Sequence, residues 1–148
     1  MEPTKPHRTL VVANRTAAAP LLLEEIARRR AERPTVFVLL IPLGGSGKRR
    51  DWTAQDAVRL LARAARGPVE SVVAEADPFE AVRHALDQGD FDDVIISTLP
   101  KRVSEWLRRD LPSKVRRLGI PVTVISQHEE GSYALHEART HTLAPGPG

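Results

Sequence analysis

The sequence predicts an α/β protein: a single flavodoxin- or Rossmann-like three-layer α/β/α sandwich around a five-stranded parallel sheet in the order 3-2-1-4-5. Short runs of Val, Leu and Ile alternate along the chain with amphipathic segments of helical length. These runs lack the apolar–polar alternation of half-exposed strands, so we expect strands buried on both faces. Right-handed crossovers between such strands place helices on both sides of the sheet. A length of 148 residues fits one domain of this kind.

The expected strands cover residues 9–13, 36–42, 69–74, 93–96 and 120–126. The first helix runs from residue 17 or 20 to residue 33. It carries glutamates early and arginines late, as the helix dipole favours, and Pro34 ends it. The second helix is capped by Thr53 and stopped by Gly67 and Pro68. Its buried stripe should consist of Ala57, Val58, Leu61, Ala64 and Ala65.

The third helix has a clear start, with Asp77 as the capping residue and Pro78 at the first helical position. Gly89 should end it. A polar loop from residue 97 to residue 103 then leads to a basic helix that we expect to break at Pro112. The carboxyl ends of the first and fourth strands meet where the strand order reverses, which is where open α/β sheets bind ligands.

The composition limits the possible functions. The chain has no cysteine, which excludes disulfides, thiol nucleophiles and cysteine-based zinc sites. It contains no apolar run long enough to cross a bilayer, and residues 1–7 lack the apolar segment of a secretory signal. We therefore expect a soluble, cytoplasmic protein with no membrane partner.

Charge is distributed unevenly. Residues 70–93 hold eight acidic residues and one arginine, a net charge of −7, whereas residues 101–117 have a net charge of +5. Such a bipolar surface suits self-association or anion binding at least as well as a nucleic-acid footprint. No aromatic residues that could stack on bases are interleaved with the basic ones, which argues against nucleic-acid binding.

The segment Gly44 to Arg49 (GGSGKR) invites comparison with a phosphate-binding loop. The pattern G-x-x-x-x-G-K-[ST] is not met, because Pro42 stands at the first glycine and Arg49 replaces the hydroxyl that holds magnesium. We interpret the segment as a basic connector.

Three segments together resemble the universal stress protein family, over residues 8–126. They are TLVVANRT at 9–16, EADPFEAV at 75–82 and GIPVTVIS at 119–126. Members often have Asp-x-Ser where this chain has Asn14, Arg15 and Thr16. The resemblance implies a flavodoxin-like fold, frequent homodimerisation through the last strand and, in one branch, ATP binding.

That branch carries Gly, two residues, Gly, nine residues, Gly, then Ser or Thr after the fourth strand. Here the same spacing falls on Ser97, Pro100, Asp110 and Leu111, so the glycines and the hydroxyl are absent. Pro100 also lacks a backbone donor. We expect the Asp110 carboxylate to cap the helix that contains Pro112, where it would repel a phosphate.

Two interpretations follow. In the first, the chain keeps the fold and the dimer, does not bind ATP in the glycine-loop manner, and acts as a non-enzymatic stress-response or regulatory module through a protein partner or an unidentified ligand. In the second, it binds ATP, another adenine nucleotide or another anion through basic side chains. The candidate ligand-binding residues are Ala13, Asn14, Thr16, Ile41, Ser97, Thr98, Pro100, Lys101, Arg102, Arg109 and Asp110.

Each polar candidate also has a structural explanation. Asn14 could form an Asx turn, and Ser97 and Thr98 could satisfy loop backbone groups. None of the five histidines (His7, His84, His128, His136 and His141) lies at the carboxyl end of an expected strand, and none forms the i, i+4 pair of a metal helix. We therefore expect no catalytic residues and no metal, with weak nucleotide hydrolysis, by analogy with the universal stress proteins, left as the alternative.

The last strand should lie at the sheet edge, where Val122, Thr123, Val124 and Ile125 carry no charge that would discourage pairing. We expect a homodimer through this edge. The chain then divides into a flexible leader (1–7), the α/β domain (8–126) and a polar, partly disordered tail (127–148).

Overall fold

The computed structural model describes residues 5–13, 16–17, 19–42, 54–98 and 105–126. Its strands are β1 (His7–Val12), β2 (Thr35–Pro42), β3 (Glu70–Ala74), β4 (Asp93–Thr98) and β5 (Val122–Ser126). They form one sheet in which every neighbouring pair is parallel and the order is β3-β2-β1-β4-β5. The predicted fold class and strand order are confirmed.

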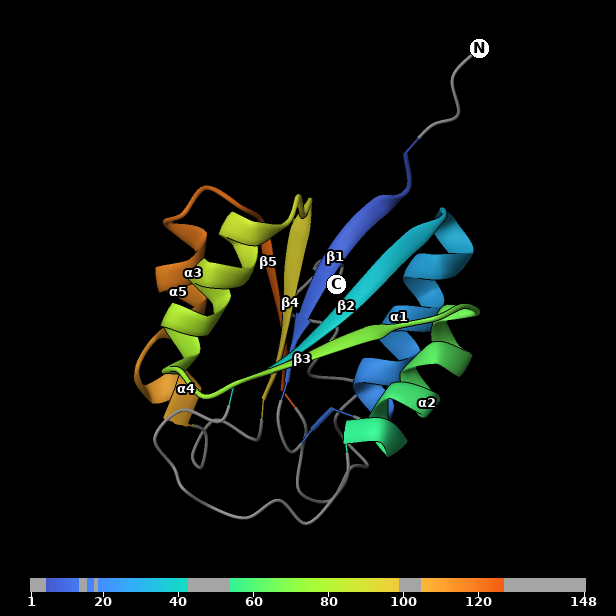
Figure 1. The fold of residues 1–148 in the computed structure, drawn as a ribbon, viewed down its shortest axis with the longest axis horizontal. Helices are drawn as coiled ribbons and strands as arrows, with labels where there is room; N and C mark the ends of the chain where they lie inside the picture. Colours follow the sequence, from blue (N-terminus) through green and yellow to red (C-terminus); the bar gives the residue numbers. More distant parts are fainter. Residues whose placement is uncertain (1–4, 14–15, 18, 43–53, 99–104, 127–148) are drawn as a thin grey trace, which may run out of the picture.

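The helices are α1 (Pro20–Glu32), α2 (Ala54–Ala65), α3 (Pro78–Gln88), α4 (Glu105–Arg108) and α5 (Leu111–Arg116). Figure 1 shows α1 and α2 on one side of the sheet and α3, α4 and α5 on the other. The three layers of the expected sandwich are therefore present. None of these helices has the length and apolar composition needed to cross a membrane, within the part of the chain that the structure describes.

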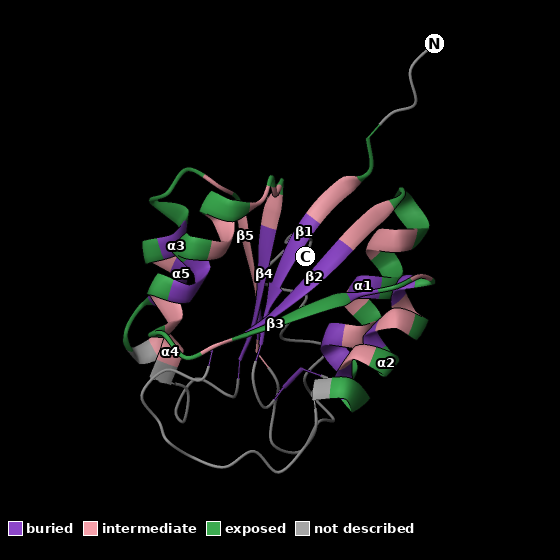
Figure 2. Cartoon of the chain, in the orientation of Figure 1, coloured by how far each residue is buried: buried purple, intermediate pink, exposed green. Residues whose placement is uncertain are grey.

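Each face of the sheet has its own core, because successive side chains of a strand point to opposite faces. In β1, Val11 packs in the core with α1 and α2, whereas Leu10 and Val12 pack in the core with α3 and α5. Figure 2 shows the buried residues concentrated along β1, β2 and β4, while β3 is exposed over most of its length. Aliphatic side chains make up nearly all of both cores, as the low aromatic content requires.

The helix ends are formed partly as expected. The Asp77 carboxylate caps α3 by accepting hydrogen bonds from the backbone N–H groups of Phe79 (3.1 Å) and Glu80 (3.3 Å). The end of α2 differs from the prediction: Arg66, with φ of 59°, takes the left-handed conformation that usually falls to glycine, and Gly67 N–H donates to the Ala62 carbonyl.

Three boundaries correct the sequence-based prediction. Ser97 and Thr98 belong to β4, where they pair with Ile125 and Ser126, and the loop begins after them. The helical break lies at Arg109 and Asp110 because Pro112 sits in the first turn of α5, where proline is tolerated.

The third correction concerns His7, which we expected in a flexible leader and which begins β1. The glycine-rich connector at 44–49, the expected helix cap Thr53 and the tail at 127–148 lie outside the described residues.

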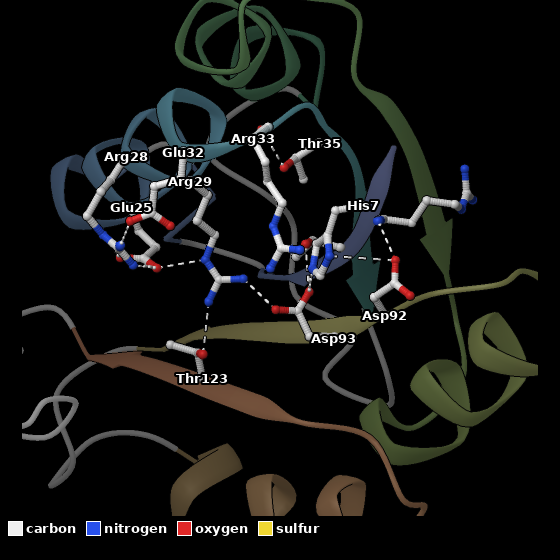
Figure 3. Close-up of polar contacts among 12 residues, drawn as sticks. His7, Glu25, Arg28, Arg29, Glu32, Arg33, Thr35, Asp92, Asp93 and Thr123 are labelled. Carbon is white, nitrogen blue, oxygen red and sulfur yellow. Dashed lines mark hydrogen bonds and ion pairs between the residues drawn. The ribbon is translucent and has the colours of Figure 1, made fainter. Parts of the chain in front are cut away.

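A polar network joins α1 to the amino ends of three strands (Figure 3). Asp93 of β4 is its centre: its carboxylate accepts from Thr9 Oγ1 at 2.6 Å and from an Arg29 guanidinium N–H at 2.5 Å, and His7 Nε2 lies 3.2 Å away. Arg29 also donates to Thr123 of β5 (2.9 Å) and to Glu25 one turn earlier in α1 (2.7 Å). The network thus connects α1 with β1, β4 and β5.

The environment of Asp93 favours its charged form. Burial is the largest single influence and raises the pKa of this carboxyl, but the Thr9 hydrogen bond, the Arg29 charge and the bonds from Arg29 and His7 together lower the pKa below its ordinary value. A carboxylate with a lowered folded-state pKa contributes stability above its unfolded-state pKa, near 4, and loses it as the pH falls through the folded-state pKa. Asp93 should therefore stabilise the fold at neutral pH.

We predict that Asp93→Asn lowers the free energy of unfolding at pH 7 by about 2 kcal/mol, because it removes charge-assisted hydrogen bonds from a largely buried arginine. The difference between wild type and variant should shrink as the pH falls below about 4. Urea unfolding followed by circular dichroism from pH 7 to pH 3 measures both effects. Asp92→Asn is the matched control, since Asp92 is 56% exposed and should change stability by less than about 0.5 kcal/mol. Equal effects of the two variants would contradict the assignment.

Candidate functional site

The carboxyl ends of β1 and β4 are joined by a pair of buried hydroxyls. Thr16, in the turn after β1, donates its hydroxyl to the Ser97 carbonyl at 3.0 Å, and its Oγ1 lies 2.8 Å from Ser97 Oγ. Thr16 is 6% exposed and Ser97 is 1% exposed. The two residues lie at the reversal of strand order, the expected position for a ligand, and they contact each other there.

The two contacts together account for both hydroxyl protons. If Thr16 O–H donates to the Ser97 carbonyl, the second contact requires Ser97 O–H to donate to Thr16 Oγ1. In that arrangement neither hydroxyl has a proton left for an incoming phosphate. A ligand that used either hydroxyl as a donor would have to break a buried hydrogen bond, at a cost of about 1–3 kcal/mol.

The other candidate residues at this end of the sheet are also buried. Ala13 and Ile41 belong to the core formed with α1 and α2, and Thr98 is 3% exposed at the end of β4. Asn14, Pro100, Lys101 and Arg102 lie outside the described residues.

Charged groups meet at the outer rim of this end of the sheet. Asp77, the cap of α3, lies 3.8 Å from the Arg109 guanidinium, which comes from the junction between α4 and α5. Both side chains are at least about half exposed, so the pair contributes little to stability and can separate at little cost. Arg109 is thus a cation at the carboxyl end of the sheet that an anionic ligand could recruit from Asp77.

The role that we expected for Asp110 is corrected by the structure. Asp110 precedes α5 as predicted, but its side chain makes no capping hydrogen bond, and its backbone is left-handed, with φ of 59° and ψ of 41°. A left-handed capping residue turns its side chain away from the helix N–H groups that an extended one reaches. The side chain is exposed, so the carboxylate is screened by solvent and repels an anion less than a capping carboxylate would.

The described residues contain no cluster of three or more His, Asp or Glu side chains arranged to hold a metal ion. Of the two histidines that the structure describes, His7 lies in the network at the opposite end of the sheet and His84 is exposed on α3.

No family model matches the chain, and no curated protein matches it. Among solved structures it is similar to the universal stress protein from Archaeoglobus fulgidus, with a TM-score of 0.57 and 18% identity over 80% of this chain and 93% of that chain. The fold is that of the universal stress proteins. A hypothetical protein of known structure has a TM-score of 0.54 with 15% identity, over 85% of this chain and 99% of its own. A universal stress protein in complex with cAMP has a TM-score of 0.49 with 14% identity, over 82% and 98%.

The backbone of Asp110 has a positive φ, the conformation that glycine adopts without strain. The turn before α5 is thus one in which a side chain is disfavoured, although aspartate is among the residues that tolerate it. The sequence indicated neither this turn nor the contact between Asp77 and Arg109; the only hint was the opposite charge of their two segments.

We predict that Asp110→Gly is at least as stable as wild type and more stable than Asp110→Ala by about 1 kcal/mol, because a Cβ is disfavoured in the left-handed region. Urea unfolding of the three proteins at pH 7 measures the order. An alanine variant as stable as the glycine variant would contradict the left-handed conformation at this position.

Proposed function

We propose that this chain is a non-enzymatic, cytoplasmic module of the universal stress protein type with a stress-response or regulatory role, and that it does not bind ATP in the glycine-loop manner. The observation that carries the proposal is the hydrogen-bonded pair of Thr16 and Ser97 at the strand switch point. Hydroxyls that a nucleotide site would turn toward its ligand are buried here and bonded to each other.

The sequence after β4 supports the same proposal. A glycine loop binds phosphate because its backbone N–H groups approach the ligand closely. Where the ATP-binding branch has its second glycine this chain has Pro100, which has no N–H, and the final hydroxyl is replaced by Leu111, which is 3% exposed and packs in the core with α3.

A second candidate function is the binding of ATP, another adenine nucleotide or another anion through basic side chains after β1 and β4. The observation that favours it is the exposed Arg109, whose partner Asp77 is already engaged by two backbone N–H groups of α3. An anion could take Arg109 and leave Asp77 capping its helix.

We predict no heat of binding in isothermal titration of the full chain at about 50 µM with ATP and magnesium, since the hydroxyl pair must break and no glycine loop replaces it. A dissociation constant in the low micromolar range would contradict the first function and support the second. In that case Arg109→Ala should weaken binding about tenfold, and Arg83→Ala, which alters an exposed arginine paired within α3, should leave it unchanged.

We further propose a homodimer through β5. Among the described residues β5 pairs with β4 alone, which leaves its outer edge available to a second copy. Its side chains are well placed on the sheet: Ile125 is 5% exposed, Thr123 is held by Arg29, and Val122 packs against the core formed with α3 and α5. A strand fixed in this way presents its backbone groups in register for pairing.

We predict that Val124→Lys, which places a charge on β5, weakens this dimer at least tenfold and lowers the mass measured by light scattering at about 100 µM. Leu118→Lys is the control, because Leu118 is 42% exposed and precedes the strand. An unchanged mass for Val124→Lys, or an equal decrease for both variants, would contradict pairing through β5.

A further inference from the structure

The other edge of the sheet, β3, exposes apolar side chains. Val72 is 48% exposed and Val73 is 45% exposed, two of the four large hydrophobic residues that the described part of the chain exposes. Val72 is paired in register with Leu40 and Val73 with Ile41, which belong to the cores on opposite faces of the sheet. Because paired residues of a sheet share a face, β3 is apolar on both faces at its outer edge.

The edge also lacks most of the features that prevent strand pairing. Natural edge strands are commonly protected by lysines, prolines or bulges. The strand Glu70–Ala74 contains no lysine, arginine or proline, and its one charged residue, Glu70, stands at its start. Within the described residues β3 pairs with β2 alone, so its outer backbone groups face away from the sheet.

The charges at the two ends of β3 favour a second copy of the chain, in antiparallel orientation, as the partner at this edge. Arg66 is exposed before the strand, and Glu75 is exposed after it. Parallel pairing of two copies would place Glu70 beside Glu70 and Glu75 beside Glu75. In antiparallel pairing, Glu75 of each copy instead lies near Arg66 of the other copy. The two-fold symmetry gives this favourable pairing of opposite charges at both ends of the interface.

We propose that β3 pairs antiparallel with β3 of a second copy, about a two-fold axis at Val72. In this register Val72 faces Val72 of the partner, Ser71 faces Val73, and Glu70 faces Ala74. Every residue of β3 is therefore opposite an uncharged residue, and the Glu70 side chains of the two copies lie at opposite ends of the interface. A self-complementary strand of this kind is what a two-fold interface requires.

This interface goes beyond the proposed dimer through β5 because it uses the opposite edge of the sheet. If both edges pair, dimers joined at β5 associate further through β3, and the mass rises with concentration above that of a dimer. Pairing at β3 does not depend on pairing at β5, so the two can be tested separately.

The test uses single cysteines, which the chain permits because it has none of its own. Directly opposite residues of antiparallel strands have Cα atoms about 4.5–5.5 Å apart, within the roughly 4.4–6.8 Å that a disulfide spans. Val72→Cys should therefore form a disulfide-linked dimer on oxidation with diamide at about 10 µM protein. Two residues at position 71, or two at position 73, are offset by two positions and lie about 8 Å apart, so Ser71→Cys and Val73→Cys should cross-link at least tenfold more slowly.

Non-reducing gels over time give the three rates, and circular dichroism checks that each variant is folded. Equal rates at the three positions, or no linked dimer from Val72→Cys, would overturn the proposal. If the cysteine variant does not fold, Val72→Lys provides a second test. This variant should lower the mass of the largest species in light scattering at about 100 µM. A mass equal to that of the wild type would likewise overturn the proposal.

Discussion

The ion pair between Arg29 and Asp93 is the contact on which the arrangement of this sheet depends most. Arg29 belongs to α1 and Asp93 to β4, and through Thr123 the same guanidinium reaches β5. A largely buried ion pair contributes little net stability over a well-packed apolar contact, but it is specific, since a misplaced partner leaves a charge uncompensated. It therefore fixes β4 and β5 relative to α1 at the amino end of the sheet. At the carboxyl end of the sheet, β1 and β4 are connected by a weaker interaction, the hydrogen bond between the uncharged hydroxyls of Thr16 and Ser97.

Most of the fold could be predicted because it follows from local signals that agree with one another. The unbroken apolar runs, the cap at Asp77 and the proline at residue 78 each have one structural meaning, and the crossover rule leaves few topologies. The errors occurred where tertiary pairing overrides a local signal. Ser97 and Thr98 are polar and looked like loop, yet β5 supplies them with partners. His7 looked like a leader residue because its partner Asp93 is 86 positions away.

The position of the candidate site could be predicted from the sequence, but the orientation of its side chains could not. Strand order places the ends of β1 and β4 together, so Thr16 and Ser97 were expected at one site. Whether two hydroxyls turn toward a ligand or toward each other depends on side-chain rotamers and on the surrounding loops, and residue types do not encode these choices. The same holds at Asp110: aspartate is a good capping residue in extended conformation and is tolerated in left-handed conformation, so the residue alone left both possibilities.

The charge pattern has a different meaning in three dimensions from the one it had along the chain. The acidic block contains α3 and the basic block contains α5, and these helices pack against each other on the same face of the sheet. Where the two blocks come together, opposite charges lie next to each other within one copy, as the approach of Asp77 to Arg109 shows. Two neighbouring opposite charges largely cancel each other's field at distances well beyond their separation, and salt screens what remains beyond a Debye length of roughly 10 Å. Such pairs therefore cannot attract another copy from a distance. The pairing between copies that we propose must then depend on short-range features, namely the exposed strand edges and the few charges that flank them.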